Sequence, residues 1–141
     1  MAAMEQRASF ITLAVADVAR SRAFYVDGLG WQPIFEADEV LMLPVAERMI
    51  LSLWSVEGFT AEIGAPPAPG IAPLTLAHNV ATDAEVDAVL AEAAALGAPV
   101  TPAVRRDWGG YSGYFADPDG FRWEIAMNPD ETGAFVLAPR S

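Results

Sequence analysis

The sequence predicts an α+β fold of two tandem βαβββ modules that form a mixed sheet. The chain has 141 residues, and 53% of them are hydrophobic, which requires a substantial core or a large interface. Residues 64–70 are rich in proline and glycine and divide the chain near its middle. The same order of elements is expected on both sides of this division, and the sequence ITLA of Ile11–Ala14 returns as LTLA at Leu74–Ala77.

The first module is expected over residues 8–62. Phe10–Val15 is a short β-favouring run, and Asp17 follows it in the position of a helix cap. The helix is expected to end at about Val26, because Gly28 is typical of the residues that follow helix C-termini. Three further strands are expected at residues 31–36, 40–44 and 48–55.

The second module is expected over residues 73–129, after a linker at 63–72, and is followed by a tail at 130–141. Thr82 and Glu85 have the spacing of a capping box at the start of an amphipathic helix that ends at Leu96 and Gly97. The strands are expected at residues 74–80, 100–104, 111–116 and 121–127, and residues 134–137 could add an edge strand.

The charge and the missing residue types exclude several functions. There are 19 acidic residues against 8 basic ones, all arginine, so the formal charge is −11, which disfavours nucleic acid and anionic membranes as partners. Without lysine or cysteine, the chain has no Schiff-base lysine, no thiol nucleophile and no thiolate metal site. No apolar run approaches the length of a membrane span, and we expect a cytoplasmic protein.

Residues 106–129 carry the chain's best candidate site. They read as two strands joined by a tight turn, in which Asp117 and Asp119 are interpreted as structural turn residues. Strand alternation turns Glu124 to the face opposite Trp123 and Ile125. Glu124 is therefore either a carboxylate on a face open to a ligand, which the family resemblance given below implies is the cavity, or one held by an arginine or by backbone donors at a strand end.

Aromatic side chains precede Glu124 and are interspersed with glycines. Trp108, Tyr111 and Tyr114 could be ordinary core and turn residues, but such a pattern also marks places where a ligand approaches the backbone. We expect at least one of the three to line a pocket, with Trp54 and Phe35 extending the wall.

His78 is the only histidine of the chain. Its parity matches that of Leu74, Leu76 and Val80, which places it away from the cavity and favours a structural, hydrogen-bonded role. A bulge in its strand would reverse this assignment.

Two motifs carry a family resemblance. Residues 15–30, VADVARSRAFYVDGLG, resemble the opening of the vicinal oxygen chelate superfamily, and residues 115–124, FADPDGFRWE, resemble its closing motif. That superfamily includes glyoxalase I, extradiol dioxygenases and bleomycin-binding resistance proteins. The resemblance covers nearly the whole chain and implies that the modules form a curved mixed sheet around a cavity, each module being a half-barrel whose inner face lines it.

In metal-dependent members, each module supplies two ligands. The resemblance places these positions at Phe10, Ser52, Thr75 and Glu124, of which only Glu124 is a strong ligand. We therefore expect no metal and no other cofactor.

Two functions from different classes follow. The first is a metal-free, homodimeric binding protein of the glyoxalase/bleomycin resistance type that holds a small apolar or aromatic molecule, and its acidic pocket would also suit a cation. The second is a lyase, isomerase or dioxygenase-like enzyme that uses Glu124 as its base. A cavity filled by the protein's own side chains is a third reading. The candidate ligand-binding residues are Phe10, Phe35, Ser52, Trp54, Thr75, Trp108, Tyr111, Tyr114 and Glu124.

Overall fold

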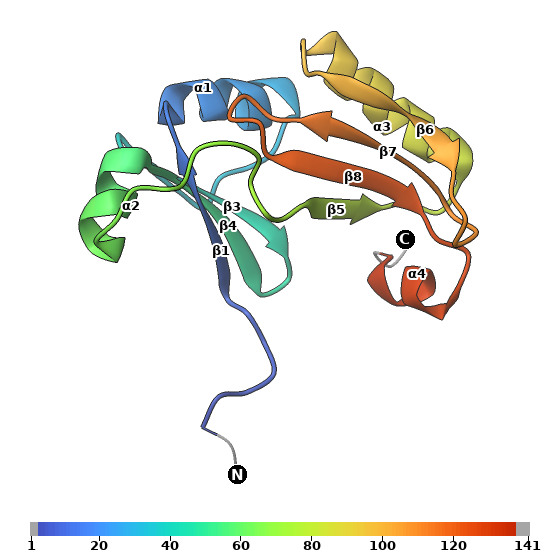
Figure 1. Cartoon of the computed structure of the whole chain (residues 1–141), viewed down its shortest axis with the longest axis horizontal. Helices are drawn as coiled ribbons and strands as arrows, with labels where there is room; N and C mark the ends of the chain where they lie inside the picture. The colour runs from blue at the N-terminus through green and yellow to red at the C-terminus, as the bar shows by residue number, and fades with distance from the viewer. Residues whose placement is uncertain (1–2, 138–141) are drawn as a thin grey trace. The chain divides into compact units, whose positions relative to one another are not determined.

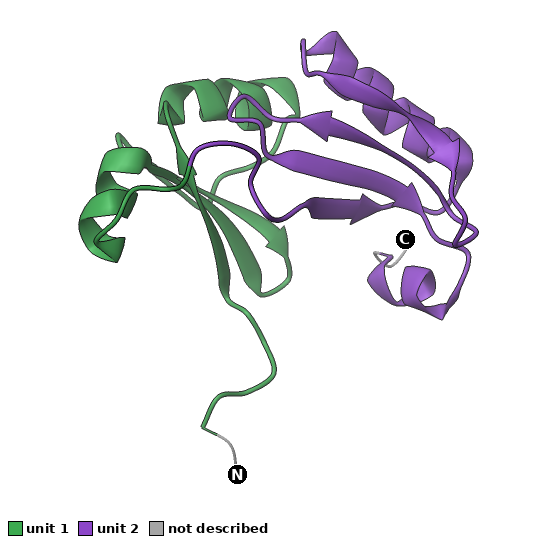
Figure 2. Ribbon diagram, in the orientation of Figure 1, with its two compact units in different colours: residues 1–68 green, residues 69–141 purple. Residues whose placement is uncertain are grey.

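The computed structural model describes residues 3–137, shown in Figure 1. The chain divides into two compact units, residues 1–68 and residues 69–141 (Figure 2). Each unit contains a four-stranded mixed sheet, with strand order β1-β4-β3-β2 in the first and β5-β8-β7-β6 in the second. The predicted α+β class and the two tandem modules are thereby confirmed, and the strands form two separate sheets, neither of which is closed.

Unit 1 follows the predicted order and adds one helix. Its elements are β1 (Phe10–Val15), α1 (Val18–Arg22), a π-helical turn η1 (Ala23–Gly28), β2 (Phe35–Ala37), β3 (Val40–Ala46), β4 (Met49–Ser55) and α2 (Val56–Ile63). Asp17 caps α1 as predicted, because its carboxylate accepts hydrogen bonds from the backbone N–H groups of Ala19 and Arg20. In both sheets the first and last strands of the module pair in parallel, and the remaining pairs are antiparallel.

Two expectations for unit 1 were wrong in detail. The strand expected at 31–36 begins only at Phe35, because the N–H group of Trp31 donates to the Tyr25 carbonyl and the two rings pack at 5.3 Å. The helix α2 was not expected at all. Ser55 caps it by accepting a hydrogen bond from the N–H group of Gly58, and Gly64 ends it with a φ of +92°.

Unit 2 contains β5 (Leu76–Asn79), α3 (Asp83–Ala95), β6 (Val100–Arg105), β7 (Tyr111–Ala116), β8 (Arg122–Met127) and α4 (Glu131–Val136). The cap of α3 forms as predicted, with the Glu85 N–H group donating to Thr82 Oγ1, and Glu85 accepts in return from Ala81. The edge strand expected at 134–137 was wrong. Asp130 accepts hydrogen bonds from the N–H groups of Thr132 and Gly133 and starts α4 instead.

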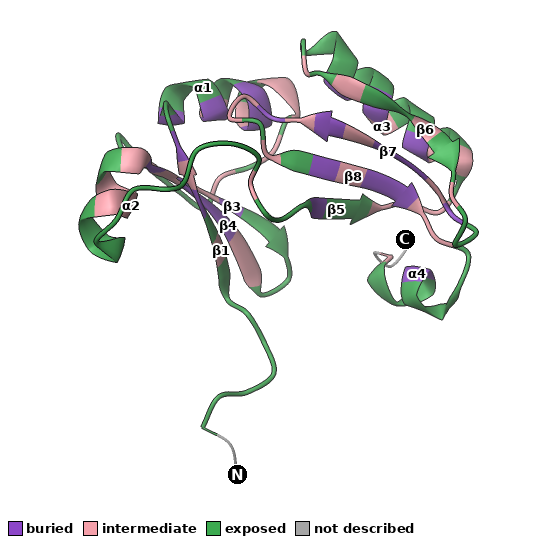
Figure 3. Cartoon of the chain, in the orientation of Figure 1, coloured by how far each residue is buried: buried purple, intermediate pink, exposed green. Residues whose placement is uncertain are grey.

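Strand alternation gives each sheet one buried face (Figure 3). In unit 2 this face packs against α3, which contributes Val86, Leu90 and Ala93 to the core. The strand residues of the two cores are Leu13, Val15, Leu41, Leu43, Leu51 and Leu53 in unit 1, and Leu76, Phe115, Trp123 and Ile125 in unit 2. The opposite faces of the two sheets are left to carry most of the candidate site residues.

Candidate functional site

Strand register places Glu124 on the face of the second sheet that α3 does not cover. Glu124 of β8 lies opposite Tyr114 of β7 and Ala77 of β5, while Ile125 lies opposite His78. Partners in a ladder direct their side chains to the same face. The sequence-based assignment of Glu124 to the face opposite Trp123 and Ile125 therefore agrees with the register.

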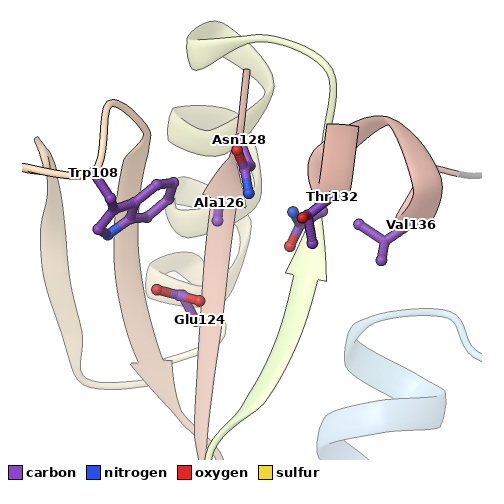
Figure 4. A pocket seen from close by; sticks show the side chains of 7 residues that line it. Trp108, Glu124, Ala126, Asn128, Thr132 and Val136 are labelled. Atoms are coloured by element: carbon purple, nitrogen blue, oxygen red, sulfur yellow. The ribbon is translucent and has the colours of Figure 1, made fainter. Parts of the chain in front are cut away.

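A groove of about 360 Å³ lies along this face (Figure 4). Its floor is the small side chain of Ala126, whose ladder partner on β5 is Asn79. Trp108 stands on one side of Ala126, and α4 stands on the other. We call this hollow the Glu124 groove, and its lining residues are Asn79, Trp108, Glu124, Ala126, Asn128, Thr132 and Val136.

The Trp108 wall is held by the turn between β6 and β7. The N–H group of Arg106 donates to the Gly110 carbonyl at 2.8 Å, and the N–H group of Gly109 donates back to the Arg106 carbonyl at 3.0 Å. Gly110 is buried beneath the indole, and a Cβ atom there would overlap the six-membered ring of Trp108. The ring lies against the backbone because residue 110 has no side chain, and half of the Trp108 surface (50%) remains exposed.

The opposite wall depends on a second glycine. Gly133 of α4 packs so closely on Asn128 that a Cβ atom would overlap the Asn128 carbonyl. This contact brings Thr132 and Val136 of α4 to the groove. Asn128 Oδ1 accepts a hydrogen bond from the N–H group of Asp130 at 3.1 Å, so the amide nitrogen of Asn128 is the part left to meet a ligand.

Among residues 3–137, Glu124 is the only charged residue that lines the groove. It is half-buried, and its Oε2 accepts a hydrogen bond from the Tyr114 hydroxyl at 3.2 Å. Arg106 does not pair with it. The guanidinium donates to Ser112 Oγ at 2.9 Å and to the Ser112 carbonyl at 3.0 Å, with its Cζ 6.0 Å from the centre of the Tyr114 ring. Across residues 3–137, no arginine or histidine lies within ion-pair distance of the Glu124 carboxylate.

The pKa of Tyr114 is raised above its ordinary value of 10.0. Burial is the largest cause, followed by the negative charge of Glu124 and the hydrogen bond to it, while Arg106 acts in the opposite direction. Tyr114 is therefore a hydrogen-bond donor to Glu124 throughout the neutral range, which fixes the orientation of the carboxylate.

The structure places other candidates of unit 2 outside the groove. Tyr111 lies on the α3 face, where its hydroxyl donates to Asp87 at 2.8 Å and its ring stacks on Arg105. Thr75 precedes β5 and is exposed. His78 lies on the face its parity predicted, without a bulge in the β5 register, but its side chain is exposed rather than covered by the helix.

The candidates of unit 1 gather on one face of the first sheet. Ser52 lies opposite Met42, which also pairs with Phe35, and the alternation along β4 turns Trp54 to the same side. Phe10 pairs with Ile50 on this face, and both Phe10 and Phe35 are 52% exposed, whereas Ser52 is buried. Among residues 3–137, the side chains that line the Glu124 groove all belong to unit 2.

The donor chemistry does not fit a metal ion. Of the four positions to which the family resemblance points, Phe10 carries no donor, Ser52 and Thr75 carry neutral hydroxyls, and only Glu124 is a strong ligand. Within residues 3–137, no group of three or more His, Cys, Asp or Glu side chains is placed to hold a metal ion.

Sequence reasoning missed the second wall of the groove. Asn128 was expected at the end of the second module but was not selected as a site residue. Thr132 and Val136 were assigned to the tail, although Asp130 is a residue type that favours the cap of a helix. Asn79 had the parity of the cavity face but was not selected as a site residue. No sequence pattern indicated that Arg106 would bind Ser112, because the two residues meet only when β6 and β7 pair as a hairpin.

Comparisons with known proteins agree with the predicted family. The family model for the Glyoxalase/Bleomycin resistance protein/Dioxygenase superfamily matches residues 7–125. A glyoxalase-related enzyme from Fulvimarina pelagi is 35% identical, with a TM-score of 0.82 over 89% of this chain and 90% of that one. The comparison with curated proteins gave no match.

Two more distant structures share the fold. A glyoxalase/bleomycin resistance protein/dioxygenase from Nocardioides is 19% identical, with a TM-score of 0.74 over 92% of this chain and 91% of that one. Lactoylglutathione lyase from Agrobacterium tumefaciens is 22% identical, with a TM-score of 0.71 over 94% and 98% of the two chains. Among the helices of residues 3–137, none has the length and apolar character needed to cross a membrane.

Gly110→Ala should displace the Trp108 ring, because the new methyl group and the indole cannot occupy the same space. We expect a loss of stability of about 1–3 kcal/mol, typical of overpacking, together with a changed tryptophan fluorescence spectrum. The matched control is the same substitution in a Trp108→Ala background, measured as a double-mutant cycle by urea denaturation. Equal costs of Gly110→Ala in the two backgrounds would show that the indole does not rest on this glycine.

Alkaline titration should reveal the contact between Tyr114 and Glu124. Because the pKa of Tyr114 is raised in the folded state, its contribution to stability is complete below the unfolded pKa of about 10 and is lost as pH rises through the folded pKa. Glu124→Gln removes the negative charge and should lower the pKa of Tyr114, as followed by phenolate absorbance. Asp87→Asn is the control, since it should lower the raised pKa of Tyr111 and leave the Tyr114 step in place.

Proposed function

The chain belongs to the glyoxalase/bleomycin resistance protein/dioxygenase superfamily, and from this premise we propose that it is a metal-free protein that binds a small apolar or aromatic molecule. The observation that carries the proposal is the Glu124 groove, where a half-exposed indole stands beside a single carboxylate. Ligand sites are commonly hollows of a few hundred Å³ lined by aromatic side chains and a few placed polar groups.

The groove supplies the contacts that such a ligand needs. Trp108 offers an aromatic face, Ala126 leaves room beside it, and Val136 closes the far side with apolar surface. Asn79, Glu124 and Thr132 add polar atoms that can orient the ligand. The volume of about 360 Å³ lies at the small end of the range for ligand sites and suits a compact molecule.

Two features support binding without a metal. The donor set at the four positions indicated by the family resemblance contains one strong ligand, Glu124, and a single carboxylate holds a transition metal poorly at neutral pH. The Glu124 carboxylate also accepts a hydrogen bond from Tyr114, which occupies part of its coordinating capacity.

An enzyme is the second candidate, and the pairing of Tyr114 with Glu124 is the observation that favours it. A carboxylate that faces a groove can take a proton from a bound molecule, and a neighbouring phenol can donate to an oxyanion. A lyase, an isomerase or a dioxygenase-like enzyme would then use Glu124 as its base. We rank this function second because, within residues 3–137, Glu124 is the only titratable side chain that lines the groove.

We also propose that the protein is a cytoplasmic homodimer. The support for a dimer is the exposed apolar surface of unit 1, where Phe10, Ile34 and Phe35 are each more than half exposed. Light scattering of the purified protein should give twice the mass of one chain. A monomeric mass at concentrations well above the micromolar range would contradict the dimer.

A thermal-shift screen of flat aromatic compounds should detect ligands of the groove. A compound present at about 100 times its dissociation constant stabilises the folded state by about 2.7 kcal/mol, which raises the melting temperature by several degrees. Trp108→Ala should abolish the shift, because the indole is the main aromatic surface of the groove.

Phe59→Ala is the matched control, since it removes an aromatic residue of α2 in unit 1 and leaves the lining residues of the groove in place. A shift that survives in Trp108→Ala would place the binding site elsewhere. Conversion of a bound compound that depends on Glu124 would instead support the enzyme.

A further inference from the structure

We propose that the Glu124 groove is polarised and selects a ligand with a positively charged nitrogen at its Glu124 end and a hydrogen-bond acceptor at its Asn128 end. The flat body of the ligand lies between them against Trp108. This inference rests on the proposed binding function and names the chemical class of the ligand.

The Glu124 end requires a donor. A carboxylate has about four lone-pair sites, and the Tyr114 hydroxyl is the one donor found at those of Glu124 within residues 3–137. On this face, Arg106 is committed to Ser112 by two hydrogen bonds, and Arg122, two residues before Glu124 on β8, forms no ion pair with it within residues 3–137. The carboxylate therefore retains acceptor capacity and an unpaired negative charge, which attract a cation and repel an anion.

The Asn128 end requires an acceptor. Its Oδ1 is already used by the backbone N–H group of Asp130, and this bond fixes the orientation of the amide. The remaining polar atom is the amide nitrogen, which Figure 4 shows directed along the strand toward Ala126. An amide nitrogen can only donate, so the matching ligand atom is a carbonyl, hydroxyl or ether oxygen.

The spacing of the two ends sets the shape of the ligand. Glu124 lies within β8 and Asn128 directly follows its last residue, and four residues at the rise of a strand correspond to about 13 Å. Ala126 lies midway between them and leaves the floor open, with Trp108 beside it (Figure 4). An indole face also attracts cations, so the wall and the Glu124 end favour the same ligand.

Half of this arrangement lies beyond the segment that carries the family match. The match covers residues 7–125, whereas Asn128 and the α4 residues Thr132 and Val136 follow it. The acceptor-selecting end and the second wall therefore consist of residues that lie outside the family match.

A matched set of indoles tests the polarity by titration calorimetry. Tryptamine carries an ammonium group, indole-3-propionate carries a carboxylate, and 3-ethylindole is neutral, while all three share the same ring. We expect tryptamine to bind the wild-type protein about tenfold or more tightly than indole-3-propionate, a difference of roughly 1.4 kcal/mol. Glu124→Gln should remove most of this preference and leave the affinity for 3-ethylindole within about twofold.

Glu92→Gln is the charge-matched control, because it removes one exposed carboxylate from α3, on the far side of the sheet. It should leave the preference unchanged. The Asn128 end is tested with 5-methoxytryptamine, whose added ether oxygen should improve binding to the wild-type protein and lose that gain in Asn128→Ala.

The outcomes separate the two proposals. Binding of all three indoles with equal affinity, and with dependence on Trp108, would overturn the polarity and retain the proposed function. A preference for tryptamine that persists in Glu124→Gln would also overturn the polarity. If none of the three indoles binds, both the polarity of the groove and the proposed binding function are overturned. The comparison of the three indoles uses the wild-type protein, so it does not depend on whether any variant folds.

Discussion

The strict alternation of side chains along β8 is the constraint on which the site depends. Trp123 and Ile125 must face α3, because their burial forms the core of unit 2. Glu124 and Ala126 are then forced to the opposite face, where one supplies a charge and the other supplies space. A shift of one residue in register would place the carboxylate in the core, so the energy that holds the core together also holds the site.

Both walls of the groove rely on glycine for close packing rather than for unusual backbone angles. At Gly110 the missing side chain lets an indole lie on the strand, and at Gly133 it lets a helix lie on the carbonyl of Asn128. Neither residue has a positive φ angle. At these two positions the lack of space for a Cβ atom, and not a left-handed backbone, is therefore what requires glycine.

The sequence predicted the features that depend on short-range patterns. Alternation and capping residues identified β1, β7 and the start of α3, and parity assigned His78 and Glu124 to opposite faces. The prediction of a strand from residue 31 was wrong, because a contact that the pattern does not reveal determines the structure there. The N–H group of Trp31 donates to the Tyr25 carbonyl, and the strand does not start at this residue. The groove itself was only half predicted, because its second wall depends on α4 packing back onto Asn128.

The two sheets have the same strand pairing, but the side chains differ at the corresponding set of three residues that lie opposite one another on neighbouring strands, which we call a row. In unit 1 the row is Thr12, Ser52 and Met42, and in unit 2 it is Ala77, Glu124 and Tyr114. A metal site built on such a repeat needs strong donors from both rows, and the first row offers only neutral hydroxyls and a thioether. The duplicated fold is thus retained while its two halves have diverged. One row carries a carboxylate that a phenol anchors, and the other carries no charged group, so the charge on which the proposed ligand preference depends belongs to unit 2 alone.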